Sequence, residues 1–320
     1  MCRVAGVLTR RTLWAYRDYT HWTGGHGKLL DYIRHVQAHP RWQVRLLLSA
    51  RSLALADNPF LHAAPLAERW EPTANDALLL GGMDWTVLGD APLPSSVPVL
   101  NLVQGVRHAE AGSPLRGFLS RRALRVCVST PVAAAIRATG EVHGPVQVIP
   151  AAVDGAMLAA MGRVAPQRQL FVDAVKQPAL GRELAACLAP GVPDVDVLLE
   201  RVPRPDYLRR MAQARVVLAL PEPREGFYLP GIEAMAMGRA LVQSDCVGSA
   251  DYLRAGVNAL VPRYTVPDIA QAALALAADA ELCARLGLAG TETAQAFDLP
   301  LERRRVHALL DTLDAQWEGA

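Results

Sequence analysis

The feature of this sequence that most constrains its fold is a repeated alternation of short apolar runs with segments of helical periodicity. The runs in the first half of the chain lie at Val4–Leu8, Val44–Leu48, Ala77–Leu80, Val97–Val103 and Leu124–Val128. A strand buried on both faces is apolar along its whole length, and helices that connect such strands make the sheet parallel. The pattern therefore predicts an α/β fold whose parallel sheet is covered on both faces.

The segment Gly144–Asp154 is expected to be a last strand of the first series that leads into a connector, and the same alternation begins again after it. Strands are expected at Leu170–Val172, Val195–Leu199, Val216–Leu220, Ala240–Gln243 and Ala259–Val261. Because 320 residues exceed the roughly 100–200 of one domain, we predict two domains, at 1–150 and 151–298, and a C-terminal helix within 299–320. Parallel sheets bind ligands beyond the carboxyl ends of their strands. If the two domains face each other across a cleft, their strand-to-helix loops line it.

Composition excludes several classes of protein. The chain is 51% hydrophobic and 20% charged, which is typical of a globular protein. Its 33 Lys and Arg against 31 Asp and Glu leave a formal charge of +2, so no overall attraction to nucleic acid is expected. The five Cys form no C-x-x-C pair, which argues against a disulfide framework or a zinc site. Without an apolar run of about 18 residues or a signal-peptide pattern, the sequence predicts a cytoplasmic protein.

The loop after Val216–Leu220 carries the strongest functional pattern. It contains Glu225 and Gly226, and it leads into a helix that holds Pro230 near its first position and Glu233 in its first turn. The free amides of a helix start bind phosphate, and carboxylates accept hydrogen bonds from the paired hydroxyls of a sugar or ribose. The alternative is that Glu225 is a solvated loop acid and Glu233 complements the helix dipole.

The residues of this loop continue as an ordered motif. They read E-G-F-Y-L-P-G-I-E-A-M-A-M-G over 225–238, then S-D-C-V-G over 244–248 and G-V-N-A-L-V-P over 256–262. This resembles the donor domain of the retaining GT-B glycosyltransferases of family four (glycosyl transferases group 1), and the resemblance covers roughly residues 151–296. It implies two Rossmann-like domains facing across a cleft. It also implies that Glu225 contacts the transferred sugar and Glu233 the ribose, with Gly226, Phe227, Tyr228 and Leu229 also binding the donor.

The same resemblance implies a phosphate clamp made by an arginine and a lysine after the first strand of the donor domain. Lys176 fits the lysine, but the expected arginine position falls near Asp173 and Ala174. Arg182 on the following helix is the substitute we expect, and a solvated helical arginine is the alternative. Val202, between a strand and a helix, lies where the family reads the nucleobase, although a plain turn explains it equally well.

Near the N-terminus, the segment HWTGGHGK opens a helix with glycines that can present amides to a ligand. Trp22 and Leu29 stand where a nucleotide-binding P-loop needs Gly and Ser or Thr, so that function is disfavoured. By the resemblance, Gly24 and Gly25 fall in a loop that contacts the donor phosphate, and His26 and Lys28 belong to the acceptor side. A tight turn alone is the alternative for His26.

Three further loop residues are candidates for the same cleft. Asp84 and Trp85 follow the strand ALLL, and they are expected to bind an acceptor by hydrogen bonding and ring stacking, unless Trp85 belongs to the core. His108 stands where family members often carry a histidine near the transferred sugar, and a satisfied loop histidine is the alternative. The basic stretch RGFLSRRALR, residues 116–125, suggests contact with anionic lipid or a solvated face.

The function expected from these residues is transfer of a sugar from a UDP- or GDP-linked donor to a glycan, a lipid-linked acceptor or a small molecule. Lys176 and the helix start would stabilise the leaving diphosphate, with Glu225 oriented on the sugar and His108 beside it. No cofactor and no metal are expected, because no cluster of metal-ligand residues is visible in the sequence. Location at the inner face of the membrane is a further possibility. The alternatives are a sugar-nucleotide epimerase of GT-B fold and a catalytically silent sugar-nucleotide-binding protein.

Overall fold

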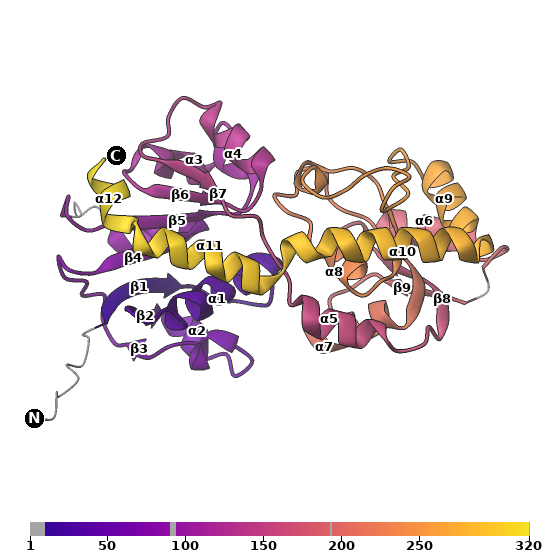
Figure 1. The fold of residues 1–320 in the computed structure, drawn as a ribbon, viewed down its shortest axis with the longest axis horizontal. Coiled ribbons are helices and arrows are strands. Elements are labelled where there is room, and N and C mark those ends of the chain that lie inside the picture. The colour runs from indigo at the N-terminus through magenta and orange to yellow at the C-terminus, as the bar shows by residue number, and fades with distance from the viewer. Residues whose placement is uncertain (1–9, 90–93, 193, 320) are drawn as a thin grey trace, which may run out of the picture. The chain divides into compact units, whose positions relative to one another are not determined.

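The computed structural model describes residues 10–89, 94–192 and 194–319. By its internal contacts the chain divides into two units (Figure 1). Unit 1 comprises residues 1–128, 132–149 and 303–320, and unit 2 comprises residues 129–131 and 150–302. Each unit is built around one parallel sheet, so the predicted α/β class is confirmed.

Unit 1 holds a seven-stranded sheet in the order β3-β2-β1-β4-β5-β6-β7, and every strand pair in it is parallel. The order turns back at β1, from which the chain builds outward in both directions. At such a switch point the loops after neighbouring strands part and leave room for a ligand. The strands are Arg11–Arg17 (β1), Trp42–Leu48 (β2), Leu66–Ala67 (β3), Ala77–Gly81 (β4), Val99–Val103 (β5), Leu124–Cys127 (β6) and Val146–Val148 (β7).

Most of these strands coincide with the apolar runs, but β1 was missed. The run predicted at Val4–Leu8 lies outside the described residues, and the central strand is Arg11–Arg17. Its sequence RTLWAYR buries only Leu13, Trp14 and Ala15, while arginines occupy both ends. A strand with charged ends and a three-residue apolar centre gives a weak periodicity signal.

The helices of unit 1 cover this sheet. The α-helices are Gly24–Gln37 (α1), Ala50–Leu53 (α2), Pro114–Gly117 (α3) and Thr130–Arg137 (α4), and 3-10 helices lie at Pro59–His62, Gly82–Leu88, Val106–Ala109 and Phe118–Ser120. Helix α1 begins where Thr23 accepts a hydrogen bond from the His26 amide at 3.2 Å, as an N-cap residue does.

Unit 2 holds a four-stranded parallel sheet in the order β11-β10-β8-β9. Its strands are Arg168–Asp173 (β8), Val195–Leu198 (β9), Ala214–Ala219 (β10) and Ala240–Gln243 (β11). Its helices are Gly155–Gly162 (α5), Pro178–Leu188 (α6), Arg204–Ala212 (α7), Leu229–Ala236 (α8), Val266–Ala278 (α9) and Ala280–Ala294 (α10), with 3-10 turns at Val247–Ser249 and Gln295–Phe297. The strand predicted at Ala259–Val261 is wrong, because Ala259 and Leu260 form only isolated bridges.

The core of unit 2 lies between its sheet and the helices α6, α9 and α10. Its buried side chains include Leu170 and Val172 from β8, Leu218 from β10, Leu184 from α6 and Leu286 from α10. The sheet and this helix layer are thereby fixed to each other, so the loops beyond the strand ends have a rigid base.

The C-terminal segment forms two helices, Leu299–Asp311 (α11) and Leu313–Glu318 (α12), and residues 303–319 belong to unit 1. The Trp317 ring nitrogen donates to the Ser95 carbonyl at 2.8 Å, and the Asp311 carboxylate contacts His39 at 3.0 Å. These contacts give the docking site that the sequence left open. None of the helices in the described part of the chain is both long and apolar enough to span a membrane.

Candidate functional site

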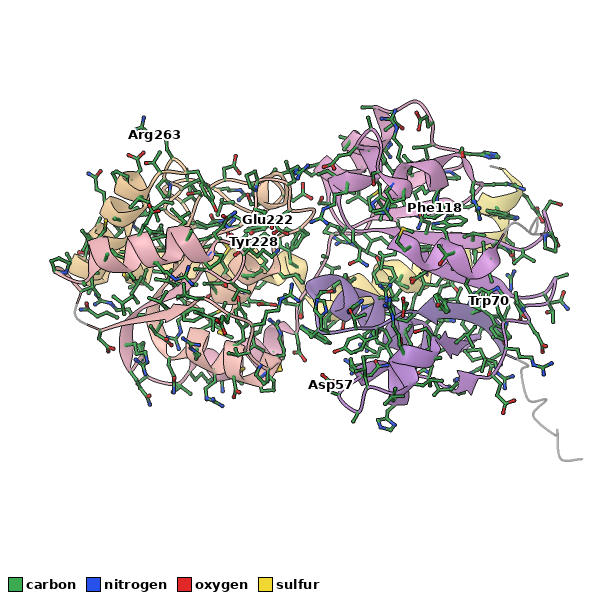
Figure 2. All side chains as sticks on the ribbon, turned by 180° about the vertical axis from the view of Figure 1, so that it is seen from behind. Asp57, Trp70, Phe118, Glu222, Tyr228 and Arg263 are labelled. Carbon is green, nitrogen blue, oxygen red and sulfur yellow. The ribbon has the colours of Figure 1, made fainter. Side chains whose placement is uncertain are left out.

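The motif residues of unit 2 gather where β8 and β10 end. Strand β8 ends at Asp173, β10 ends at Ala219, and the loop that follows β10 leads to α8. Figure 2 labels Glu222 and Tyr228 in this loop. The carboxyl ends of parallel strands are where α/β proteins place ligands, so the observed loop lies at the expected edge of the sheet.

Helix α8 starts with amides that no side chain caps. Tyr228 is its N-cap residue and makes no side-chain cap hydrogen bond, and Pro230 lies in the first turn. The amides of Leu229 and Gly231 therefore belong to the positive end of the helix dipole. Glu233 is the fifth residue of the helix and lies in its second turn, which corrects the prediction that it lies in the first.

The backbone of the motif loop is held by the segment that follows β11. A Cβ at Gly248 would lie 2.7 Å from both the Glu225 carbonyl oxygen and the Phe227 nitrogen, so only glycine allows the two loops to touch. The Tyr252 hydroxyl donates to the Tyr228 carbonyl at 2.9 Å, and the Ser129 hydroxyl donates to the Gly226 carbonyl at 2.6 Å. The close approach at Gly248 gives a structural reason why the motif segments 225–238 and 244–248 occur together.

Glu225 and Lys176 form an ion pair, although 49 positions separate them. The lysine ammonium also lies 5.5 Å from the centre of the Tyr228 ring. The Glu225 side chain is 15% exposed and that of Lys176 is 43% exposed, so the cation faces solvent. The structure thus places the two residues that the sequence analysis assigned to the sugar and to the phosphate side by side.

Glu233 is paired with an arginine that the sequence analysis did not select. Arg204, the first residue of α7, donates to both Glu233 carboxylate oxygens, in one case at 3.1 Å. The Glu233 side chain is 1% exposed. A charge buried to this degree needs a partner, and that need is the signal that could have pointed to a cation near Glu233.

Asp173 stands where the resemblance leads one to expect a phosphate-binding arginine. It is buried, and it accepts hydrogen bonds from the Tyr207 hydroxyl at 2.9 Å and the Tyr228 hydroxyl at 3.4 Å. Burial raises the pKa of Asp173, and the hydrogen bond from Tyr207 works against that rise. A buried carboxyl group here contributes no attraction for phosphate.

The two remaining donor-side candidates lie outside this network. Arg182 is exposed on α6, and its side chain makes no hydrogen bond or ion pair within the described residues. Val202 is half-buried in the turn between β9 and α7. Their assigned roles remain predictions.

In unit 1, the carboxyl ends of β1 and β4 bring a second charged pair together. The Arg17 guanidinium donates to the Asp84 carboxylate at 2.9 Å, and the Gly81 amide donates to the same oxygen at 3.0 Å. Burial raises the pKa of Asp84 to about 7, although Arg17 opposes the rise. Asp84 therefore exchanges a proton near neutral pH at the edge that holds the predicted acceptor-side residues.

The glycines at the start of α1 approach the loop after β5. A Cβ at Gly25 would lie 3.2 Å from the Gln104 amide oxygen, while Gly24 is exposed as the first residue of the helix. Both glycines therefore lie near the carboxyl end of the sheet, where their amides are available to a ligand.

His26 and Lys28 of α1 are both buried, so their side chains do not form an open surface on the predicted acceptor side. The His26 ring lies 5.1 Å from that of Tyr19 and donates through Nδ1 to the His21 carbonyl at 2.7 Å, and burial lowers its pKa to about 4. Lys28 is 3% exposed, and its ammonium contacts the Asp31 carboxylate at 2.8 Å. This favours the structural alternative for His26.

Trp85 and His108 are also buried. The Trp85 ring is 1% exposed and stacks on Phe118 with centroids 5.8 Å apart, which favours its alternative as a core residue. The His108 ring donates through Nδ1 to the Gly105 carbonyl at 3.0 Å, and burial lowers its pKa. Its Nε2 atom has no hydrogen-bond partner in the described part of the chain. The neutral imidazole thus keeps one acceptor nitrogen that lacks a partner among the described residues and is buried in the free protein.

The basic stretch 116–125 is not one continuous exposed face. Arg125 is fully buried and donates to the Asn101 side chain at 2.7 Å and to the Leu119 carbonyl at 3.0 Å. Arg116 pairs with Glu141 at 2.7 Å, and the Arg122 guanidinium lies 4.1 Å from the Trp317 ring centre. These arginines hold unit 1 together, and membrane contact remains only a prediction.

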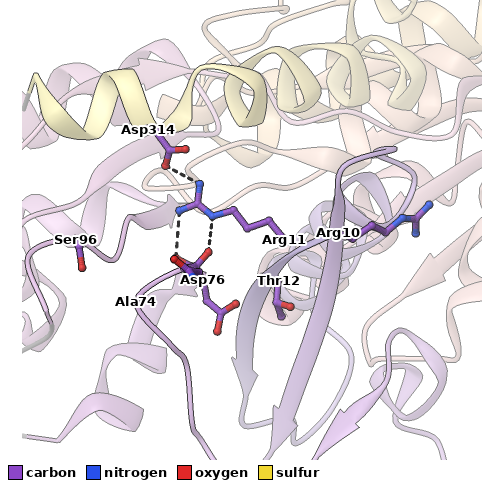
Figure 3. A pocket seen from close by; sticks show the side chains of 8 residues that line it. Arg10, Arg11, Thr12, Ala74, Asp76, Ser96 and Asp314 are labelled. Carbon is purple, nitrogen blue, oxygen red and sulfur yellow. Dashed lines mark hydrogen bonds and ion pairs between the residues drawn. The ribbon is translucent and has the colours of Figure 1, made fainter. Parts of the chain in front are cut away.

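A pocket opens at the amino-terminal end of β1, away from the strand ends that carry the motifs (Figure 3). Inside it, the Arg11 guanidinium donates to the Asp314 carboxylate at 2.6 Å and to the Asn75 carbonyl at 2.8 Å. These bonds fasten α12 to the sheet, so the pocket is explained by docking of the C-terminal segment. Within the described residues, no three His, Cys, Asp or Glu side chains are grouped to hold a metal ion.

Comparison with known proteins finds a family match for part of unit 2. Residues 156–279 match the family model described as Glycosyl transferases group 1. The D-inositol 3-phosphate glycosyltransferase of Kribbella flavida is 34% identical over 126 residues, which are 39% of this chain. The match spans only 29% of the length of that curated relative.

Solved structures share the whole fold. HepE from Anabaena, crystallised with UDP-glucose, superposes with a TM-score of 0.72 at 15% identity, covering 95% of this chain and 100% of HepE. Sucrose-phosphate synthase from Thermosynechococcus elongatus gives a TM-score of 0.67 at 14% identity, covering 96% of this chain and 100% of that one. Such low identities establish the fold alone. The chain therefore has the GT-B fold, and its residues 156–279 match the family model of the Glycosyl transferases group 1.

Proposed function

We propose that this protein is a cytoplasmic, metal-independent, retaining glycosyltransferase that moves a sugar from a nucleoside diphosphate sugar to a glycan, lipid-linked or small-molecule acceptor. One observation carries the proposal. In a segment that matches the family model, Lys176 and Glu225 are paired beside the uncapped start of α8. A cation and free helix amides suit a diphosphate, and a neighbouring carboxylate suits sugar hydroxyls.

The chemistry of this site is electrostatic. When the bond to the sugar breaks, negative charge grows on the departing diphosphate and positive charge grows on the sugar ring. The Lys176 ammonium and the amides of Leu229 and Gly231 stabilise the leaving group, while Glu225 orients the sugar. In this proposal His108 lies beside the transferred sugar, as the resemblance implies, and its buried Nε2, which has no partner among the described residues, must become exposed to accept a hydrogen bond from a sugar hydroxyl.

The donor is a UDP- or GDP-linked sugar in this proposal. The structural likeness to HepE, which was crystallised with UDP-glucose, supports the first choice. The acceptor side is assigned to the edge of the unit 1 sheet around Asp84, where the charged pair with Arg17 and the Gly25 amide lie.

A second candidate function has one observation in its favour. Asp173 at the expected arginine position weakens the phosphate site, which suits a protein that binds sugar nucleotides without catalysing transfer. A sugar-nucleotide epimerase of the same architecture shares the donor site and needs no acceptor.

The experiment that tests the proposal is a two-stage screen. Nucleoside diphosphates and their sugars are first ranked by the rise in melting temperature that binding produces. Products formed from the best donor are then identified with and without candidate acceptors. Transfer only when an acceptor is present supports the proposal. An epimerised donor without acceptor supports the epimerase, binding without product supports the silent protein, and binding of none of these compounds contradicts all three.

A further inference from the structure

The donor-site residues of unit 2 form one connected charged network. Asp173 lies at its centre and accepts hydrogen bonds from the hydroxyls of Tyr207 and Tyr228. A cation lies over each tyrosine ring. The Arg204 guanidinium is 5.4 Å from the Tyr207 ring centre, and the Lys176 ammonium is 5.5 Å from the Tyr228 ring centre. Each cation is also paired with a motif carboxylate.

The two halves of this network therefore match. Lys176 is held by Glu225 in the loop before α8, and Arg204 is held by Glu233 within α8. In each pair the carboxylate is the more buried partner. The Arg204 side chain is 34% exposed, whereas that of Glu233 is 1% exposed. The two cations reach solvent, and their partners hold them in place.

The position of Arg204 is not explained by the stability of its own helix. It is the first residue of α7, where the helix dipole disfavours a positive charge. Asp206 in the same turn is the residue type that the dipole favours. An arginine at this point, held by a fork of two hydrogen bonds to a buried carboxylate, is placed for something other than helix formation.

Both oxygens of Glu233 are engaged by Arg204, so a ribose diol can bind Glu233 only if the guanidinium gives up at least one of them. If this ion pair breaks, the buried Glu233 carboxylate and the Arg204 guanidinium both need new partners. A nucleoside diphosphate brings both, because its ribose hydroxyls can bind the carboxylate and its phosphates can bind the guanidinium. Planar bidentate recognition of phosphate is the geometry that arginine favours.

We propose that Arg204 is the second phosphate-binding cation of the donor site, held on Glu233 in the free protein and transferred to the donor diphosphate when the ribose binds. The inference rests on the proposed function and adds a specificity-determining residue to it. In this arrangement Arg204 takes the role that Asp173 cannot fill, and Arg182 on α6 has no part in it.

The test measures the affinity of three probes for four proteins. The probes are the nucleoside diphosphate that binds wild type most tightly, its monophosphate and its nucleoside. The proteins are wild type, Arg204→Ala, Arg204→Lys and Arg182→Ala, the last of which removes the competing candidate for the phosphate-binding arginine. For Arg204→Ala we expect the dissociation constant of the diphosphate to rise about tenfold or more, while that of the nucleoside stays equal or falls, because Glu233 is released for the ribose. Arg204→Lys keeps the charge without the fork and should recover part of the diphosphate affinity.

The outcomes separate the inference from the proposed function. If no nucleoside diphosphate binds wild type, the proposed function fails and the inference fails with it. If wild type binds but Arg204→Ala weakens all three probes equally, Arg204 is only structural and the inference is overturned. A loss in Arg182→Ala as large as that in Arg204→Ala also overturns it. If Arg204→Ala does not fold because Glu233 is left unpaired, Arg204→Lys decides: an unchanged ratio of diphosphate to nucleoside affinity contradicts the inference.

Discussion

At the scale of single residues, two buried groups in unit 1 have opposite effects on stability. Burial raises the pKa of Asp84 from 3.8 to about 7, so its contribution to stability is present below about pH 4 and is lost as the pH rises towards 7. Burial lowers the pKa of His26 from 6.5 to about 4, so its contribution is present above about pH 6.5 and is lost as the pH falls towards 4. The two contributions offset each other over nearly the same range.

Replacing Asp84 with Asn should reveal the pH dependence of stability that His26 contributes. Since one pKa unit corresponds to about 1.4 kcal/mol, each group contributes on the order of 3 kcal/mol. The Asp84→Asn variant should therefore gain stability steeply from pH 4 to 6.5, where wild type changes little. All six Trp of the chain belong to unit 1, so urea unfolding followed by tryptophan fluorescence reports this unit alone. The control is Asp57→Asn, which changes an exposed acid in the same unit. A pH profile of Asp84→Asn parallel to that of wild type would contradict the assignment.

The sequence alone assigned Lys176 and Glu225 to one donor site, but it did not indicate that Arg204 belongs to the same network. The first two residues belong to patterns that a single sequence displays, namely a lysine after a strand and an acid before a helix. The pairing of Arg204 with Glu233 joins α7 to α8 across 29 positions and depends on how these helices pack. The arginines of 116–125 show the same limit, because nothing in their spacing reveals that Arg125 is buried beside Asn101.

At the scale of elements, the position of the motif loop depends on a glycine in the neighbouring loop. Gly248 allows the turn after β11 to touch the backbone of Glu225–Phe227. Gly231 has a similar role inside α8, since a Cβ there would lie 2.1 Å from the Gln243 side-chain oxygen. Two of the motif glycines therefore serve packing.

The substitution Gly248→Ala tests this packing. Its methyl group must displace backbone atoms, and we expect a loss of stability on the order of 1–3 kcal/mol together with weaker donor binding. Gly117→Ala is the control, because a Cβ at Gly117 meets nothing within 4 Å. Thermal unfolding followed by circular dichroism, with and without the donor, measures both effects. Unchanged stability and affinity in Gly248→Ala would show that the two loops separate easily.

The elements themselves were predictable to different degrees. Strands β4, β8 and β11 each contain a short, apolar, buried run, and these runs are visible in the sequence. The predicted strand at Ala259–Val261 has a similar composition, yet Leu260 forms an isolated bridge to Val242 of β11, and Ala259 bridges Ala255 instead. Strand formation depends on pairing with neighbours as well as on composition.

At the scale of the whole molecule, the C-terminal segment belongs to the unit in which the chain begins. Trp317 joins the apolar cluster of Trp14, Leu80 and Trp85, and the Arg122 guanidinium covers its ring. The amphipathic pattern of residues 299–316 predicts a helix but not its docking partner, since many apolar surfaces accept the same stripe. Only the folded structure identifies that partner.

Removing the Trp317 ring should destabilise unit 1. Truncation of a buried aromatic side chain costs about 3–5 kcal/mol, and the Ser95 carbonyl also loses its donor. Urea unfolding of Trp317→Ala, followed by the fluorescence of the remaining tryptophans, should shift to lower urea concentration. Glu318→Ala, which changes an exposed neighbour, is the control. Equal midpoints for the two variants would mean that α12 contributes nothing to unit 1.

The whole account depends on the assignment of Lys176 to the diphosphate and of Glu225 to the sugar. The most direct measurement is the rate of sugar transfer by wild type, Lys176→Ala and Glu225→Ala, with nucleoside diphosphate affinity measured on the same folded proteins. Removing a preorganised charged group from a catalytic site typically costs about 10²–10³ in rate, and we predict a loss of that size in both variants. Diphosphate affinity should fall in Lys176→Ala but stay equal or rise in Glu225→Ala, because the lysine is then released for phosphate. Folded variants that transfer sugar as fast as wild type would contradict the account.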